Sequence, residues 1–488
     1  METKREIKNK KKFYITTAIA YANAAPHIGH ALEYIQADAI ARYHRKKEDV
    51  WFLTGMDEHG DKINRVALSS EKTAKVFVDE IAKIFKALKK DLNLSYDDFI
   101  RTTDKKKHWP GVYAIWNKLL KRGDIYLKNY QGLYCVGCEK FLTEKDLNEE
   151  GNCPIHKKKP ELVEEQNYFF RLSRYEGQIR ELIESGKMDV KPTATRSEIL
   201  SFLNQGLEDI SFSRSKKTVP WGIPIKDSDQ TIYVWGDALV NYISAIGYGR
   251  DEETFKRLWP AEVHLIGKDI ARFHAVIWPA MLLSAGLKTP KKIFTHGYIT
   301  VDGEKMSKSI GNVISAFEPA KKYGIDPLRY YVLREIPSDG DGDFSYDRLT
   351  ERYERDLARG LGNFVSRTLN LINGEKIDVS KAPSKEVRDE VKRMRARVEK
   401  GFDEFRLHEA LSAVFDFIKA GDIYVNDKQP WKNKSVKISR DLLAYLEHIG
   451  EYIEPFMPET SKKIKSALKY KEDFCTPKKI DPLFPLQK

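Results

Sequence analysis

The strongest constraint on the fold is the order of elements near the start of the chain. FYITTAIAY (13–21) is mostly apolar and rich in strand-forming residues, as expected of a buried parallel strand. HALEYIQADAIARYHRKK (30–47) has apolar residues at helical spacing, and VWFLTG (50–55) is a second apolar strand. A strand, a turn, a helix and a strand form a βαβ unit, so we predict a parallel sheet that binds ligands at the carboxyl ends of its strands.

The segment PHIGH (26–30) follows the first of these strand ends, and MDEHG (56–60) lies at the second. A helix that starts at PHIGH presents unpaired N–H groups and the positive end of its dipole, which suits an anion. His27 and His30 can share one face of its first turn, and Gly29 leaves room for a close approach to the backbone. We therefore predict contacts to a phosphate whose charge grows in a transition state; the alternative is two surface histidines at a helix start.

A second basic motif lies far along the chain, in TVDGEKMSKSIGNVI (300–314). Its lysines Lys305 and Lys308 are three residues apart in a segment rich in glycine and serine. Lysine acts on phosphate as a point charge, so the pair predicts a cation clamp. Taken by itself, the motif fits an ordinary exposed basic loop better than a clamp.

Three of the four cysteines lie close together with a histidine. Cys135 and Cys138 form a C-x2-C pair, and Cys153 and His156 form a C-x2-H pair. This spacing is typical of a closed tetrahedral zinc site, which leaves no open position for catalysis. We predict one structural zinc ion per chain.

Composition limits the class of protein. The chain has 488 residues, of which 41% are hydrophobic, and a net charge of +12. It has no uninterrupted apolar run near the roughly 20 residues of a membrane span, and the basic start METKREIKNKKK resembles neither a signal nor a transit peptide, so we expect a cytoplasmic protein with no membrane partner. The excess of lysine and arginine suits either a polyanionic partner or a solubilising surface.

Taken together, the PHIGH and KMSKS segments resemble the two signature motifs of the class I aminoacyl-tRNA synthetases, and the resemblance runs over nearly the whole chain. Within that class the chain most resembles the methionyl-tRNA synthetases, because its insertion is short and carries a single zinc knuckle. The resemblance implies an α/β fold: a Rossmann-like parallel-sheet catalytic domain, split by a zinc-knuckle connective-peptide insertion and followed by an α-helical anticodon-binding bundle. The expected boundaries are 1–125 and 226–300 for the two catalytic halves, 126–225 for the insertion, 301–352 for the KMSKS loop and stem-contact region, and 353–488 for the bundle.

The resemblance also implies residue roles. ATP would be bound by His27, Gly29, His30, Asp269, Lys305 and Lys308, with Asp269 on the ribose; the histidines, the lysines and Arg214 would be catalytic. Asp57 would hold the ammonium group of methionine, and the rest of the methionine site would comprise Ile19, Ala20, Tyr21, Trp235, Ala238, Leu239, Tyr242, Ile270 and His274, with Phe273 and Trp278 alongside. The anticodon would contact Asn363, Arg367, Pro430 and Trp431. Asn363 and Arg367 share a helix face, and an unpaired base can stack on a tryptophan.

The implied reaction forms methionyl-adenylate and pyrophosphate from L-methionine and ATP, and then transfers the methionyl group to tRNA(Met), including the initiator tRNA. Magnesium would accompany ATP. The chain ends soon after the bundle, without the C-terminal dimerisation domain of many relatives, so we expect a monomer of this chain as it stands, whether that domain is naturally absent or has been trimmed. Three alternative functions fit the sequence less well. A small nucleotidyltransferase would have no need of the C-terminal bundle, and a zinc-dependent RNA-binding protein would have no need of PHIGH and KMSKS. A cysteinyl-tRNA synthetase would have its zinc ion in the active site, whereas here the zinc ligands lie in the insertion.

The run Asp339-Gly-Asp341-Gly-Asp343 is similar to the first residues of an EF-hand calcium-binding loop. An EF-hand requires glycine at position six and glutamate at position twelve, where this chain has Phe344 and Thr350. We predict an acidic surface turn.

Overall fold

The computed structural model describes residues 11–138, 140–142, 146–306 and 311–486. These residues form two compact units. The first comprises residues up to 25 together with 47–87 and 96–295, and the second comprises 26–46, 88–95 and the chain from 296 onward. No helix in the described ranges is both long and apolar enough to cross a membrane.

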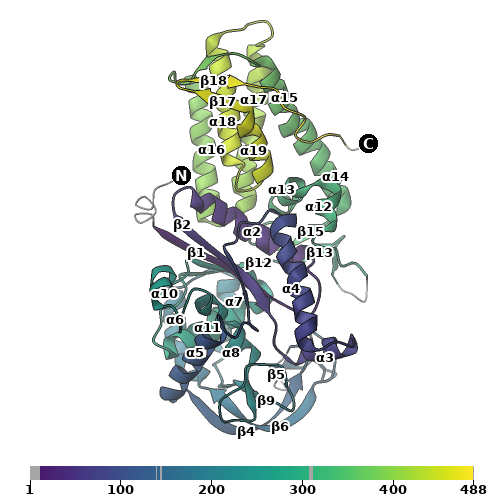
Figure 1. The fold of residues 1–488 in the computed structure, drawn as a ribbon, viewed down its shortest axis with the longest axis vertical. Coiled ribbons are helices and arrows are strands. Elements are labelled where there is room, and N and C mark those ends of the chain that lie inside the picture. The colour runs from purple at the N-terminus through teal and green to yellow at the C-terminus, as the bar shows by residue number, and fades with distance from the viewer. Residues whose placement is uncertain (1–10, 139, 143–145, 307–310, 487–488) are drawn as a thin grey trace. The chain divides into compact units, whose positions relative to one another are not determined.

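A largely buried parallel sheet forms the centre of the first unit (Figure 1). Its strand order is β3-β2-β1-β11-β12-β7, and β1 pairs in parallel with both β2 and β11. The predicted βαβ start is confirmed, because β1, α2 and β2 follow one another along the chain and the two strands are parallel. The bounds are β1 Lys12–Tyr21, α2 Ile28–Arg45, β2 Asp49–Asp57, β3 Asp98–Arg101, β7 Asp189–Lys191, β11 Val263–Gly267 and β12 Lys292–His296.

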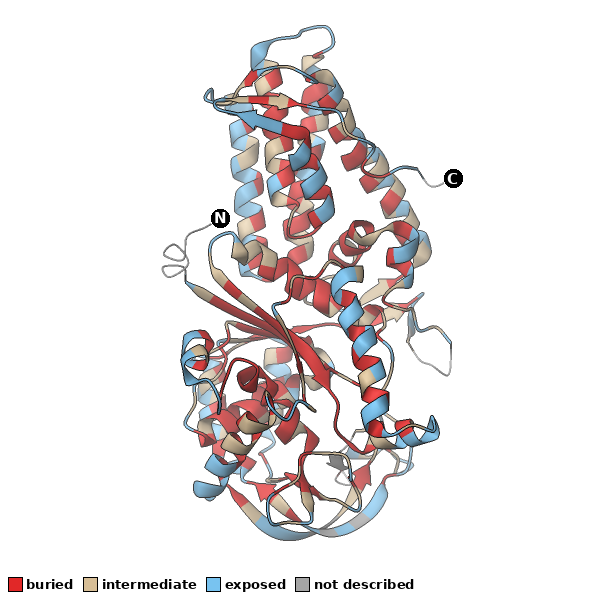
Figure 2. Cartoon of the chain, in the orientation of Figure 1, coloured by how far each residue is buried: buried red, intermediate tan, exposed pale blue. Residues whose placement is uncertain are grey.

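An apolar core in this unit includes Tyr14, Leu53 and Trp278. Figure 2 shows buried residues along the strands of the central sheet. The helices of this unit are α3 Asp61–Ser69, α4 Ala74–Asp91 (whose last turn belongs to the second unit), α5 Trp109–Lys121, α6 Glu176–Glu184, α7 Thr193–Asn204, α8 Val234–Ala238, α9 Asn241–Ser244, α10 Glu252–Leu258 and α11 Trp278–Ser284. Short non-α helical turns, Lys268–Ile270 and Phe273–Ile277, connect β11 to α11.

The predicted insertion contains an antiparallel sheet of order β5-β4-β6-β8, dominated by the long pairing of β4 with β6. Its bounds are β4 Ile125–Cys135, β5 Lys140–Leu142, β6 Glu161–Phe170 and β8 Ile210–Ser211. The range 226–300, expected to be the second catalytic half, opens with a short strand, β10 (Gln230–Ile232). This strand pairs antiparallel with β9 (Ser213–Ser215) in a separate two-stranded sheet, and it is not part of the parallel sheet.

The second unit is mainly helical, as predicted for the C-terminal region (Figure 1). Its helices after α2 are α12 Glu318–Tyr323, α13 Ile325–Glu335, α14 Tyr346–Arg352, α15 Asn363–Leu371, α16 Lys385–Asp403, α17 Leu407–Lys428, α18 Val436–Tyr452 and α19 Pro458–Ala467, and a π-helical segment, Tyr353–Gly362, joins α14 to α15. The long helices are amphipathic, and α16 and α18 begin at serines whose hydroxyls cap the first turn.

Two small sheets in this unit were not expected. One has the order β14-β13-β15, with β13 Ile299–Val301, β14 Glu304–Lys305 and β15 Gly342–Phe344. The other has the order β16-β18-β17, with β16 Ile377–Asp378, β17 Leu468–Lys471 and β18 Phe474–Pro477. Cys475 lies buried in β18, where burial raises the pKa of its thiol to about 11.

Candidate functional site

The PHIGH segment forms the N-terminal cap of α2, as predicted. His27 is the N-cap residue, and its Nδ1 accepts a hydrogen bond from the Gly29 N–H at 3.1 Å. His30 Nδ1 accepts in turn from the His27 N–H at 3.2 Å, so the two imidazoles form a reciprocal capping box. Because Nδ1 is an acceptor in both rings, the neutral form of each ring carries its proton on Nε2. Burial, with smaller effects from His27 and His296, lowers the pKa of His30 well below its usual value, so this ring is a neutral donor.

Gly29 allows this cap to close. A Cβ atom at residue 29 would lie 2.9 Å from Cε1 of His27 and 3.0 Å from its Nδ1. It would also lie 3.9 Å from the terminal carbon of Met306, the second residue of KMSKS. The glycine in PHIGH therefore serves the packing of the histidine ring over the helix start.

The segment that follows KMSKS pairs with PHIGH. The Ile28 N–H donates to the carbonyl of Ile314 at 3.0 Å, and His27 and Ser315 form an antiparallel bridge. The two motifs are thus brought together within one unit, although they are far apart in the sequence. Lys305 ends β14, and Lys308 lies outside the described residues.

A cluster of aromatic rings in the first unit contains several of the predicted methionine-site residues. Trp235 stacks on Phe273 with ring centroids 3.7 Å apart, and His274 meets Trp235 edge-on at 6.2 Å. His274 Nδ1 lies 2.9 Å from the carbonyl of Ile270, which can only accept, so Nδ1 carries the proton. The Tyr242 hydroxyl lies 2.7 Å from His274 Nε2 and therefore donates to it. Burial lowers the pKa of His274 to about 4, which keeps the ring neutral.

The other residues predicted for the methionine site, and Asp269 predicted for ATP, lie at strand ends, on α8, on α11 and in the turn after β11. Ile19, Ala20 and Tyr21 end β1 and pair in register with Gly55, Met56 and Asp57 of β2. Asp57 is only 7% exposed. Ala238 and Leu239 are buried at the end of α8, Trp278 is buried at the start of α11, and Asp269 is exposed in the turn after β11.

A buried hydrogen-bonded chain next to this cluster was missed by the sequence reading. His59 Nδ1 and His108 Nε2 each lie 2.6 Å from one oxygen of Asp237, and His108 Nδ1 lies 2.8 Å from the Ser244 hydroxyl. Burial acts to raise the pKa of Asp237, but the two imidazoles hold it below its usual value. The chain ties the loop after Asp57 to α8. The sequence feature that could have indicated this hydrogen-bonded chain is Asp237, a carboxylate within the apolar run VWGDAL.

Arg214 lies in β9 and is 3% exposed. Its Nη1 donates to the Ser213 carbonyl at 2.7 Å and to the Ser211 hydroxyl at 2.9 Å. Its guanidinium also lies over the rings of Tyr233 and Tyr134. These contacts join β9 to both Tyr134 of the insertion and Tyr233 beyond it.

The predicted zinc ligands converge. One donor atom from each of Cys135, Cys138, Cys153 and His156 lies within 4.8 Å of all the others. The Sγ atoms of Cys138 and Cys153 are 3.6 Å apart, and the distances from the three Sγ atoms to His156 Nδ1 are 3.8, 3.3 and 3.8 Å. A tetrahedral zinc ion with normal bond lengths needs separations of about 3.8 Å between sulfurs and about 3.6 Å between sulfur and nitrogen. The donor set and its spacing fit a closed zinc site.

Gly137 was missed by the sequence reading but lies at the centre of this arrangement. A Cβ atom there would lie 2.5 Å from Cγ and Cδ2 of His156. Only glycine leaves room for the imidazole between the two cysteines of the first pair.

The predicted anticodon residues also gather within the second unit. Asn363 and Arg367 lie on α15, and Pro430 and Trp431 follow α17. The Arg367 guanidinium lies 5.1 Å from the centre of the Trp431 ring. It is held there by Asp422 at 3.2 Å and by the side-chain oxygen of Asn426 at 2.8 Å. Trp431 is 51% exposed, so much of its surface is accessible.

This combination of a parallel-sheet unit, a histidine-capped helix paired with the segment after KMSKS, and a helical region defines a class I aminoacyl-tRNA synthetase. The model of the family described as tRNA synthetases class I (M) matches residues 13–159 and 146–369. A methionine–tRNA ligase of Thermotoga maritima is 42% identical over 479 residues, covering 94% of this chain and 76% of that protein. The chloroplastic and mitochondrial methionine–tRNA ligase of Arabidopsis thaliana is 40% identical over 482 residues, covering 94% of this chain and 78% of that protein.

Among solved structures, the Mycobacterium tuberculosis methionyl-tRNA synthetase in complex with methionyl-adenylate superposes with a TM-score of 0.91 at 36% sequence identity. The match covers 98% of this chain and 100% of that chain. The chain belongs to the methionyl-tRNA synthetase family.

Proposed function

We propose that this protein is a methionyl-tRNA synthetase that activates L-methionine with ATP and transfers the methionyl group to tRNA(Met), the initiator tRNA included. The observation that carries the proposal is the reciprocal imidazole cap at the start of α2, paired with the segment that follows KMSKS. Because Nδ1 of each ring accepts a backbone N–H, a proton on Nε2 of each ring can be donated in a hydrogen bond to a phosphate oxygen.

In the first step, the methionine carboxylate attacks the α-phosphorus of ATP, and pyrophosphate leaves. His27 and His30 donate hydrogen bonds to phosphate oxygens as charge shifts onto the leaving group, and Lys305 and Lys308 neutralise that charge. Asp269 binds the ribose, and Gly29 admits the nucleotide to the backbone. Magnesium enters with ATP, held mainly by phosphates and water. In the second step, a ribose hydroxyl at the 3′ end of the tRNA takes the methionyl group and AMP leaves.

Methionine is selected by the aromatic cluster and the residues around it. Asp57 holds the ammonium group, and the thioether meets the Trp235 and Tyr242 rings, which favour contact with polarisable sulfur. His274 can serve here only as a neutral ring, because a charged imidazolium beside the apolar thioether would be poorly solvated. Ile19, Ala20, Tyr21, Ala238, Leu239 and Ile270 shape the remainder of the site. Arg214 would be a further catalytic residue, held by Ser211 and Ser213 and lying over the ring of Tyr233.

The zinc ion would be held by Cys135, Cys138, Cys153 and His156, and its role would be to stabilise the insertion. Residues 353–488 would act as the anticodon-binding domain, with an unpaired base stacking on Trp431 beside Pro430, Asn363 and Arg367. The enzyme would act in the cytoplasm as a monomer, and sedimentation of the purified protein checks the oligomeric state.

The test is amino-acid-dependent exchange of labelled pyrophosphate into ATP without tRNA, for each of the twenty amino acids. Exchange with methionine alone is the expected result. Exchange with another amino acid would retain the chemistry but contradict the methionine site, and no exchange at all would contradict the proposal.

The roles of the motif residues are tested by His27→Ala and Lys308→Ala. Each should lower kcat for exchange by about 100-fold, the usual loss for one donor to a developing charge, with methionine affinity unchanged. His44→Gln, at the other end of α2, is the matched control and should retain wild-type exchange.

A further inference from the structure

The β13–β14 hairpin carries the first lysine of KMSKS. Its turn consists of Asp302 and Gly303, whose φ angles are 51° and 82°. Thr300 in β13 pairs with Lys305 in β14 in antiparallel register. A shift of Thr300 therefore moves the backbone of Lys305 with it.

A single carboxylate outside the hairpin holds both of its ends. Asp343 Oδ1 accepts a hydrogen bond from the Thr300 hydroxyl at 2.6 Å and another from the Gly303 N–H at 2.8 Å. The first bond lies opposite Lys305, and the second lies at the turn. Hydrogen bonds to a carboxylate are about twice as strong as those between neutral groups.

The strand that carries Asp343, β15, is itself held in place by neighbouring backbone. β15 pairs in parallel with β13, and the Gly342 N–H donates to the Tyr298 carbonyl at 2.9 Å. Asp341 Oδ1 accepts from the Tyr298 N–H at 2.7 Å. A Cβ atom on Gly297 would lie 2.1 Å from the Gly340 carbonyl oxygen, so the two backbones touch. The run DGDGD is therefore more than an acidic surface turn: two of its carboxylates bind the segment leading into KMSKS.

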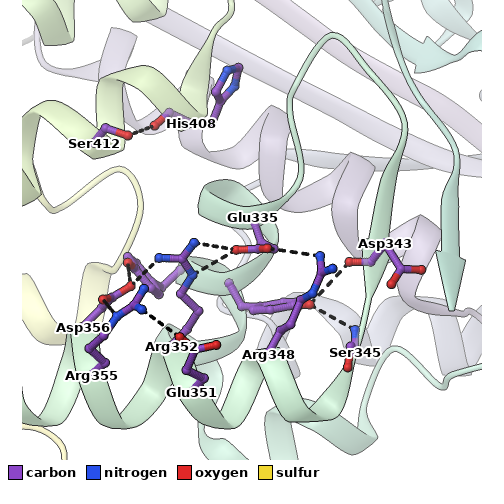
Figure 3. Close-up of polar contacts among 12 residues, drawn as sticks. Glu335, Asp343, Ser345, Arg348, Glu351, Arg352, Arg355, Asp356, His408 and Ser412 are labelled. Carbon is purple, nitrogen blue, oxygen red and sulfur yellow. Dashed lines mark hydrogen bonds and ion pairs between the residues drawn. The ribbon is translucent and has the colours of Figure 1, made fainter. Parts of the chain in front are cut away.

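Helix α13 contacts this strand through Tyr331, whose hydroxyl donates to the Asp343 carbonyl at 3.4 Å and accepts from the Ser345 N–H at 3.0 Å. Glu335 of α13 binds Arg348 at 3.4 Å and Arg352 at 2.8 Å, both on α14 (Figure 3). In Figure 3 the carboxyl group of Asp343 points away from this cluster, while Ser345 and the Asp343 carbonyl face it. Asp343 thus lies between a braced pair of helices and the hairpin.

We propose that Asp343 is a positioning residue for adenylate formation, because it fixes the hairpin that carries Lys305. The inference rests on the proposed function. Charge stabilisation requires the cation at a set distance from the phosphates, and a misplacement of about 1 Å costs about 100-fold in rate. Without the Asp343 carboxylate, β13 and the turn lose the acceptor that they share. The positive charge of Lys305 would then be poorly placed to stabilise the negative charge that grows on the leaving pyrophosphate.

The test compares Asp343→Ala with Asp343→Asn in pyrophosphate exchange and in calorimetric titration of methionine without ATP. Asp343→Ala should lower kcat for exchange by about 10- to 100-fold, with the Kd for methionine unchanged. Asp343→Asn keeps an oxygen that can accept both bonds, so it should restore activity to within about fivefold of wild type. Asp347→Asn removes the same charge from an exposed position on α14 and should match wild type.

Thr300→Val removes one of the two hydrogen bonds to Asp343 and gives a second test if Asp343→Ala does not fold. In the wild-type background, Thr300→Val should lower kcat by about three- to tenfold, the equivalent of one hydrogen bond. In the Asp343→Ala background it should not lower kcat any further, because the acceptor is already absent. Wild-type kcat in both Asp343→Ala and Thr300→Val, or equal losses of kcat and methionine affinity, would overturn the proposal. If the wild type itself shows no exchange, the proposed function has failed and not this inference alone.

Discussion

Replacing Gly137 with alanine gives the sharpest test of the zinc site. The new Cβ atom would lie 2.5 Å from two ring carbons of His156 and 2.7 Å from its Nδ1, whereas ordinary contact begins near 3.4 Å. The imidazole must therefore move by about 1 Å, which far exceeds the roughly 0.2 Å tolerance of a metal–ligand bond. The expected result is loss of His156 as a ligand.

The size of the effect follows from the ligand count. Loss of an outer-sphere partner typically weakens metal binding by about 10- to 100-fold, so displacement of a direct ligand should exceed 100-fold. Because metal binding and folding are coupled, the insertion should also become less stable. Zinc affinity is measured by competition with a chromogenic chelator, and folding by circular dichroism.

Gly177→Ala is the matched control. Gly177 lies in α6, and a Cβ atom there meets no heavy atom within 4 Å. This variant should retain zinc and gain about 0.5–1 kcal/mol in stability, because alanine favours helix. Wild-type zinc affinity in Gly137→Ala would refute the assignment of His156 as the fourth ligand.

Three further predictions concern other parts of the molecule. Burial lowers the pKa of His274 to about 4, so between about pH 6.5 and 4 the unfolded chain binds a proton that the folded chain does not. As the pH is lowered through that window, the free energy of unfolding should decrease by up to about 1.4 kcal/mol per pH unit. His274→Gln should reduce this pH dependence, measured by urea unfolding. Trp431→Ala should lower kcat/KM for tRNA by about 10- to 100-fold, the equivalent of one stacked base, whereas an equal loss of pyrophosphate exchange would contradict an anticodon role. Arg329→Met leaves the buried Asp38 carboxylate, now 2.7 Å from the guanidinium, without that partner, and should cost about 3–5 kcal/mol in the free energy of unfolding; a loss below about 1 kcal/mol would contradict this reasoning.

The sequence was most informative where neighbouring residues decide the outcome. The apolar run at 13–21 predicts β1, the helical spacing from residue 30 predicts α2, and the cap at His27 follows from their junction. The short spacings of Cys135, Cys138, Cys153 and His156 predict the ligand set, because a knuckle of so few residues can close locally. The small sheets and the antiparallel pairing of β10 escaped prediction, since strands of two to four residues carry too little periodicity.

Contacts between distant segments were decided only by the tertiary structure. The sequence shows Arg367 and Trp431 as separate residues, and packing of the helices brings the guanidinium over the indole. The sequence likewise shows DGDGD as a run of acids, and only the pairing of β13 with β15 directs Asp343 to the hairpin that carries Lys305. Local pattern fixes which residues can form a helix, a strand or a metal knuckle. Which of these elements meet depends on burial and hydrogen bonding summed over the whole unit, which no short window of sequence contains.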